Sequence, residues 1–216
     1  MNQLVIVACH AIFKNDISLA PDDDANWYLR DFQKGEAGIF IEHLRNAWRV
    51  LQESKGILVF SGSKTVYDAN LSEAESYLRL LERLGLKVNP LPRLEERALD
   101  SFQNLLFPLL DYYSENGFLP EQTTLVSWAF KKKRFEFHAN TIGLKNFRFL
   151  GVGMPEIPEP ALSSENYTLE LFKYDPWGCQ PPLFEKKAKR NVYSLKSAYY
   201  SIKSKDELPW VVSGLS

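Results

Sequence analysis

The sequence predicts an α/β fold: a Rossmann-like open sheet of five mainly parallel strands with helices on both faces. Short apolar runs alternate along the chain with longer segments of helical periodicity. The apolar runs are continuous instead of alternating with polar residues, which is typical of strands covered on both faces. Strands that alternate with helices pair in parallel through right-handed crossovers.

The five predicted strands cover residues 4–9, 57–61, 86–89, 124–128 and 147–152. The predicted helices between and after them cover residues 36–54, 72–85, 100–117 and 131–143. Asp100 or Ser101 is a suitable N-cap for the third of these helices, and Gly117 follows its end. Pro108 lies inside that helix and is expected to kink it or to split it.

The β-α rhythm stops near Gly153, which divides the chain into a Rossmann-like α/β core, residues 1–153, and a C-terminal extension, residues 154–216. The extension begins with a proline-rich linker and continues with one possible edge strand, residues 167–175. A turn-rich segment and the basic stretch 185–191 follow. We expect the extension to pack on the same domain.

Composition limits the function classes. The 216 residues include 26 Lys plus Arg against 27 Asp plus Glu, a formal net charge of −1, so we expect no nucleic-acid partner. Cys9 and Cys179 are two isolated cysteines, which favours a reducing compartment. The first residues lack a signal-peptide pattern, and no apolar run is long enough to span a bilayer. These features predict a cytoplasmic protein without a membrane partner, and they leave its oligomeric state open.

Polar residues follow four predicted strands. His10 follows the first strand, Ser61–Thr65 the second, Glu96–Asn104 the third and Ser127–Trp128 the fourth. Ligands of open parallel sheets bind outside the carboxyl ends of the strands, so these residues mark the candidate site.

The segment after the second strand suggests an anion site. Gly62 and Ser63 are small enough to let backbone N–H groups approach an anion, and Lys64 adds a charge. Ser72 and Glu75 have the spacing of a capping box at the next helix. This leaves the role of Glu73 open, because a carboxylate in the first turn of a helix could cap the helix, complement its dipole or face a ligand.

Basic residues at the start of helix 131–143 form the second signal. Lys131, Arg134 and His138 share one helical face and could hold a phosphate. A solvated basic face is the alternative. His43 is expected on the helix surface or in the core. No Walker loop, G-x-G-x-x-G or G-x-S-x-G motif is present, and no spacing indicates a zinc site.

Five motifs in this order resemble the YdcF/SanA/ElyC-like family, a domain of unknown function with a Rossmann-like core. They are "LVIVACHAIF", "LVFSGSKT", "SEAESY", "EERALDSFQNLLF" and "VSWAFKKKRF". The later "DPWGCQPPLFEKKAKRN" looks like the tail of the eukaryotic-type branch. The resemblance implies a pocket formed by His10, Gly62, Ser63, Glu73, Glu96, Asp100, Asn104 and Arg134.

Three departures from the family pattern affect its chemistry. Ser63 replaces a glycine, Gln103 replaces a glutamate, and Lys131 stands where bacterial members commonly have a histidine. One member of the family binds S-adenosylmethionine, so the resemblance implies nucleotide-like ligands.

The sequence therefore predicts an enzyme for a small phosphorylated or nucleotide-like metabolite, namely a phosphate-ester or phosphoanhydride hydrolase. Lys64, Asn104, Lys131 and Arg134, with the N–H groups of Gly62 and Ser63, would bind the ligand. Glu73, Glu96, Asp100 and His10 are the catalytic candidates. The carboxylates could also hold magnesium. The alternatives are a non-catalytic S-adenosylmethionine or nucleoside binder, with Trp27 or Trp128 stacking on the base, and an interaction protein that uses its tail.

Overall fold

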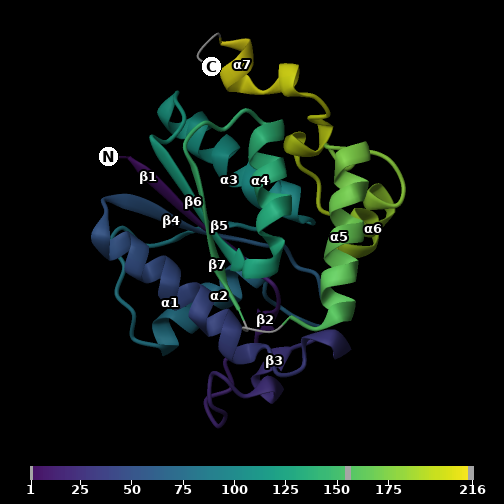
Figure 1. Cartoon of the computed structure of the whole chain (residues 1–216). Helices are drawn as coiled ribbons and strands as arrows, with labels where there is room; N and C mark the ends of the chain where they lie inside the picture. Colours follow the sequence, from purple (N-terminus) through teal and green to yellow (C-terminus); the bar gives the residue numbers. More distant parts are fainter. Residues whose placement is uncertain (1, 154–156, 214–216) are drawn as a thin grey trace.

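The computed structural model describes residues 2–153 and 157–213 and confirms the α/β prediction. Five strands form one parallel sheet, flanked by helices (Figure 1). Across the sheet they are β5 (Arg93–Glu95), β4 (Gly56–Ser61), β1 (Gln3–Ala8), β6 (Gln122–Trp128) and β7 (Phe147–Val152). A separate antiparallel pair is formed by β2 (Ile12–Phe13) and β3 (Trp27–Tyr28).

The central strand shows why the apolar runs are continuous. Every residue of β1 is buried, because successive side chains point to opposite faces and both faces are covered. Leu4 and Ile6 belong to one hydrophobic cluster, which includes residues of α3 (Ser101–Asn116) and α4 (Lys132–Thr141). Val5 and Val7 belong to the opposite cluster, with α1 (Ala37–Glu53) and α2 (Glu73–Arg83).

The order of the strands defines a switch point. In chain order the sheet reads 3-2-1-4-5, so β1 lies between the second and the fourth strand. The chain leaves β1 toward one edge and later returns to its other side as β6. Ligand sites of open α/β sheets lie at the carboxyl ends of strands at such a point.

Two predicted strands are wrong. Residues 86–89 are not a strand, because Leu86 and Val88 pack instead against the hydrophobic cluster of α1 and α2, and the edge strand is β5. Residues 167–175 belong mostly to helix α5 (Glu159–Tyr174). In addition, Pro108 does not split α3. The helix is continuous, and Pro108 is one of its buried residues.

The C-terminal extension packs on the core. Besides α5 it contains α6 (Leu183–Arg190) and α7 (Pro209–Val212). Phe172, Leu183, Leu208 and Trp210 are buried in the same cluster as α3 and α4. Part of the predicted linker, residues 154–156, lies outside the described residues, and the part from Glu159 onward is helical.

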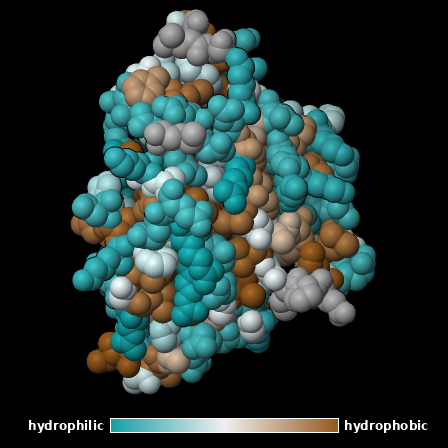
Figure 2. Space-filling view, turned by 60° about the vertical axis from the view of Figure 1, so that its left-hand side comes forward, coloured by the Kyte–Doolittle hydropathy of each residue, from teal (hydrophilic) through white to brown (hydrophobic). Residues whose placement is uncertain are grey.

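Short 3-10 helices complete the described chain: Asp24–Asn26, Asp31–Gln33, Ala129–Lys131, Ala198–Ser201 and Lys205–Glu207. On the face shown in Figure 2, hydrophilic residues predominate and hydrophobic ones gather in small groups. Within residues 2–153 and 157–213, no helix combines the length and apolar character needed to cross a membrane.

Candidate functional site

A cavity of about 710 Å³ lies at the predicted switch point. Its lining includes Cys9 and His10 after β1 and Trp128 at the end of β6. The first turn of α3 and parts of α5 and α6 form other walls. The C-terminal extension is therefore part of the cavity wall, which the sequence did not indicate.

Basic side chains outnumber acidic ones in the lining. The basic residues are Arg30, Lys34, Lys131, Arg134, Lys186 and Arg190, and the acidic ones are Glu36, Glu73, Asp100 and Glu165. Lys34 and Arg134 have carboxylate partners, Asp31 and Glu165. Among the described residues, no ion pair within 4.0 Å forms at Arg30, Lys131, Lys186 or Arg190.

The unpaired cations occupy two depths. Lys131 and Arg190 are partly buried, whereas Arg30 and Lys186 are exposed at the rim. Arg190 is held by a hydrogen bond from Nη1 to the carbonyl of Leu99, 2.8 Å away. A partly buried cation without a carboxylate partner is costly, so this arrangement favours an anionic ligand.

His10 holds Lys131. The Nζ of Lys131 lies 3.4 Å from Nδ1 of His10, and Nε2 of His10 lies 3.1 Å from Oγ of Ser127. The ammonium can only donate, so Nδ1 accepts and Nε2 carries the proton that is donated to Ser127. Burial, followed by the charge of Lys131, keeps the pKa of His10 well below its usual value, so the ring is neutral.

Lys131 is poised to change its charge near neutral pH. Burial and the neighbouring Arg134 lower its pKa to about 7, from an ordinary value of 10.5. Glu36, which also lines the cavity, has its pKa raised to about 7 by burial. Both groups therefore gain or lose a proton in the physiological range.

Glu73 faces the cavity, which resolves its predicted ambiguity. It begins α2, where Ser72 is the N-cap and accepts a hydrogen bond from the N–H of Glu75. The Glu73 carboxylate accepts a hydrogen bond from Oγ1 of Thr65 at 2.6 Å and lines the cavity. Burial raises its pKa, against the lowering effect of Thr65, Arg190 and Lys131.

The turn at Gly62 and Ser63 is not arranged as an anion cradle. The N–H of Gly62 donates to the carbonyl of Glu95, and that of Ser63 to the carbonyl of Ala98. Their own carbonyls accept from the first N–H groups of α2. Gly62 is required because a Cβ would lie 2.7 Å from Oε2 of Glu73. The turn thus positions Glu73.

Lys64 lies outside the cavity lining, and its Nζ lies 5.6 Å from the ring centroid of Tyr193. Arg134 lines the cavity, but its guanidinium forms two hydrogen bonds with Glu165, of 2.8 and 2.6 Å, and a third with Ser101. Arg134 therefore fastens α5 to α4 and is not a free anion ligand.

Asp100 and Asn104 line the cavity as predicted. Asp100 is the N-cap of α3, where its Oδ1 accepts a hydrogen bond from the N–H of Gln103. Its Oδ2 lies 3.6 Å from Nζ of Lys187 and accepts no hydrogen bond within the described residues. Asn104 retains its side-chain amide for a ligand, with one long contact of 3.5 Å from Ser61 Oγ.

Glu96 is exposed and does not line the cavity, so the structure separates it from the other predicted site residues. The neighbouring Glu95, 1% exposed, is the buried carboxylate of this segment. Glu95 accepts hydrogen bonds from Ser61, the backbone of Ala98, and both the backbone and side chain of Arg97.

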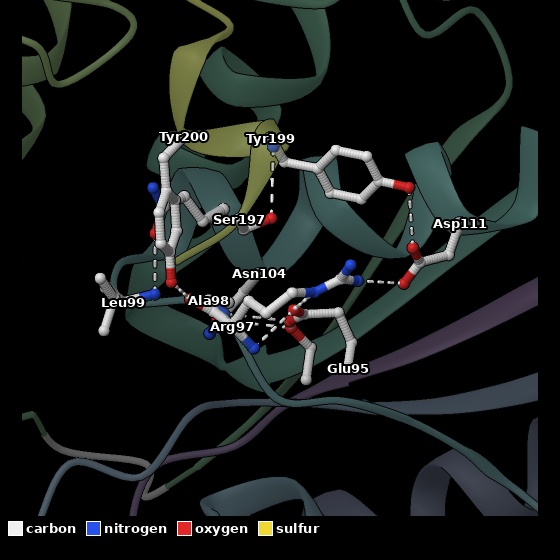
Figure 3. Close-up of polar contacts among 11 residues, drawn as sticks. Glu95, Arg97, Ala98, Leu99, Asn104, Asp111, Ser197, Tyr199 and Tyr200 are labelled. Atoms are coloured by element: carbon white, nitrogen blue, oxygen red, sulfur yellow. Dashed lines mark hydrogen bonds and ion pairs between the residues drawn. The ribbon is translucent and has the colours of Figure 1, made fainter. Parts of the chain in front are cut away.

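Figure 3 shows how this network reaches the extension. Arg97 joins Glu95 to Asp111 of α3. Tyr199 donates to Asp111 at 3.0 Å, and Tyr200 donates to the carbonyl of Arg97 at 2.6 Å. The extension is thereby fastened to the segment after β5, behind the cavity.

The two tryptophans predicted to stack on a base lie in different places. Trp128 lines the cavity, whereas Trp27 is 2% exposed and packs in the core. His138 is buried against Phe172 and Oγ of Ser101, and His43 is buried in the core beside Trp128.

The sequence reasoning missed Arg30, Glu36, Lys186 and Arg190 as cavity residues. The basic stretch 185–191 was a signal for the last two, but nothing in it shows which lysines face inward. Within the described ranges, no group of three or more His, Cys, Asp or Glu side chains is arranged to hold a metal ion.

Comparison with known proteins adds one relative. The chain is similar to an uncharacterized protein of Saccharomyces cerevisiae, YOR238W, with 27% identity over a 265-residue alignment that covers 91% of this chain and 86% of the yeast protein. No family model matches the chain, and no solved structure matches it. The resemblance to the YdcF/SanA/ElyC-like family thus remains a prediction.

Proposed function

We propose that the cavity binds a small phosphorylated or nucleotide-like metabolite and that the protein hydrolyses it. The observation that carries this proposal is the convergence on one cavity of four cations that form no ion pair with any residue the structure describes, beside the carboxylate of Glu73. Phosphoryl transfer depends mainly on positioning and on neutralising charge, which such a set of side chains provides.

In the proposed reaction, Lys131 and Arg190 hold the phosphoryl group. Glu73 is the general base: it takes a proton from water, whose oxygen forms a bond to phosphorus while the bond to the leaving oxygen breaks. The raised pKa of Glu73 suits this role. Lys131, with a pKa of about 7, can give its proton to the leaving oxygen. His10 is a positioning residue for Lys131.

A binder without turnover is the second candidate, favoured by the aromatic side chains of Tyr28, Trp128 and Phe130 in the lining. S-Adenosylmethionine and other nucleosides would stack on such rings. Product formation separates the two candidates, because both predict binding to the same cavity.

The test begins with thermal shifts of the purified chain. The panel contains phosphate, nucleotides, sugar phosphates, nicotinamide dinucleotides and S-adenosylmethionine, each with and without magnesium. A ligand at 100 times its Kd stabilises a protein by about 2.7 kcal/mol. For a chain of this size we expect the Tm to rise by roughly 5 to 10 °C. Each hit is then incubated with enzyme, and its products are followed by phosphate release and mass spectrometry.

Glu73→Gln decides the catalytic role. We expect it to keep the ligand's thermal shift and to lose about 10²- to 10⁴-fold in turnover. Glu75→Gln is the matched control, since Glu75 lies in the same first turn but pairs with Arg79 outside the cavity. Undiminished turnover in Glu73→Gln would remove Glu73 from the mechanism, and binding without product would favour the second candidate.

A further inference from the structure

One end of the cavity wall is apolar and aromatic. Tyr28, Leu29 and Phe32 line it from the segment around β3, and Ile157 and Pro158 line it from the start of α5. These two segments lie near each other in Figure 1, below the carboxyl ends of the strands. Phe32 is 74% exposed although it lines the cavity, so its ring lies at the mouth.

Exposed apolar side chains that gather in one patch often mark binding sites. Tyr28, 36% exposed, and the partly buried Phe130 are further aromatic side chains in this lining. Flat aromatic surfaces around a mouth suit a planar ring that can stack between them.

The cations of the lining are spread along the cavity. Lys131 and Arg190 lie deeper, and Arg30 and Lys186 lie at the rim, so positive charge extends along the cavity. A chain of two or more phosphates distributes its negative charge over such a length, whereas a monophosphate concentrates it at one point. The cavity of about 710 Å³ also lies within the usual range for ligands of drug size, roughly 300–1,000 Å³.

We propose that the ligand is a nucleoside di- or triphosphate, with its phosphates held by Lys131, Arg190 and the rim cations, and its base stacked at the mouth against Phe32 and Tyr28. This inference rests on the proposed function and names the ligand class for the same site. It assigns Phe32 and Arg190 as the residues that determine specificity, one for each end of the ligand.

The test is a binding series on the full chain, measured by isothermal titration at fixed pH and salt. The probes are adenosine diphosphate, pyrophosphate, adenosine, ribose 5-phosphate and geranyl diphosphate. We expect adenosine diphosphate to bind at least tenfold more tightly than each of the others, because it alone supplies both the base and the two phosphates. Variants at Phe32 and Arg190 then test the two ends of the ligand separately.

Phe32→Ala is expected to weaken adenosine diphosphate binding by roughly 5- to 100-fold, the value of base stacking on one aromatic side chain, and to leave pyrophosphate binding unchanged. Phe184→Ala is its control, because Phe184 is 55% exposed but lies outside the cavity lining. Arg190→Ala should weaken both probes, whereas Lys189→Ala, on the exposed surface of the same helix, should weaken neither. Arg190→Lys, which keeps the charge, covers the case in which Arg190→Ala does not fold.

The outcomes separate the two proposals. Equal affinity for pyrophosphate and adenosine diphosphate, with no effect of Phe32→Ala, would overturn the base position and leave a phosphate site. Geranyl diphosphate binding as tightly as adenosine diphosphate would show a mouth for any apolar group and would also overturn it. Tightest binding of ribose 5-phosphate would support a sugar phosphate instead. If no phosphate-bearing probe binds, the proposed function fails together with this inference.

Discussion

Two carboxylates near the ends of neighbouring strands, the buried Glu95 and the partly buried Glu73, have different surroundings. Glu95, the last residue of β5, accepts four hydrogen bonds from Ser61, Arg97 and Ala98. Glu73, after β4, accepts one side-chain hydrogen bond within the described residues, from Thr65, and faces the cavity. Burial raises the pKa of both.

The comparison separates a carboxylate that is satisfied within the fold from one that faces the cavity. A buried carboxylate with its lone pairs satisfied stabilises the fold and has no capacity left for a ligand. A carboxylate with a single hydrogen-bond donor and one side open to a cavity stabilises the fold less, and it remains available to react. Substitutions at the two sites should therefore have opposite effects on stability.

The largest effect is expected at Glu95. Glu95→Ala leaves Arg97 and Ser61 without their buried acceptor, and we expect the free energy of unfolding to fall by about 3–5 kcal/mol in urea titration. The exposed Glu96→Ala should stay within about 0.5 kcal/mol of the unsubstituted chain. Similar losses at both positions would break the comparison.

The next effect concerns the charge of Lys131 on the cavity side. Its pKa of about 7 means that the ammonium is lost as the pH rises. Between pH 6 and 9, a window that brackets this pKa, we expect affinity for a phosphate-bearing ligand to fall roughly tenfold, since hydrogen bonds from charged groups are worth about 1.5–3 kcal/mol and neutral ones about 1. Lys131→Arg should flatten this profile in titrations at several pH values. A profile unchanged by the substitution would place the titrating group elsewhere.

At Glu73 the expected change in stability is smaller and has the opposite sign from that at Glu95. The pKa of Glu73 is higher in the folded chain than in the unfolded chain. The contribution of Glu73 to stability therefore falls as the pH rises from its unfolded-state pKa through its folded-state pKa. Glu73→Gln should therefore gain about 0.5–2 kcal/mol at pH 8, as is common when an active-site group is neutralised, and gain little near pH 4. Urea titrations at both pH values measure it. A loss at pH 8 would mean that the carboxylate is structural.

The smallest effect sharpens the structural side of the comparison. Tyr199→Phe removes the hydrogen bond to Asp111, and we expect a loss of about 0.5–1.5 kcal/mol in unfolding free energy. Tyr174→Phe is the matched control, because Tyr174 is 85% exposed. If both variants unfold alike, Tyr199 does not fasten the extension.

The sequence was sufficient to predict four of the five strands of the sheet, because buried parallel strands carry continuous apolar runs; the short edge strand β5 carries no such run and was not predicted. It was misleading in the extension, where Leu169 and Leu171 alternate with polar residues and imitate an edge strand. The buried residues of that segment are Glu165, Thr168, Leu169 and Phe172, which follow helical spacing. Burial of a glutamate, paired with Arg134, hid this pattern.

Residues of the cavity lining were predictable where they follow directly from strand ends, at His10 after β1 and Lys131 after β6. Arg30 and Arg190 were not predictable, because their position depends on how segments far apart in the chain pack together. The choice of Glu96 over Glu95 is a register error of one residue, which exchanges the buried and exposed sides of the segment.

The position of α6 near the end of the described chain has a consequence for biosynthesis. Domains fold from the N-terminus as they leave the ribosome, and all five strands are translated before Arg190. A nascent chain can thus assemble its sheet while the cavity still lacks the wall that α6 provides. The cavity wall is complete only once α6 has been translated, so a chain interrupted before that point would carry the sheet without a finished cavity.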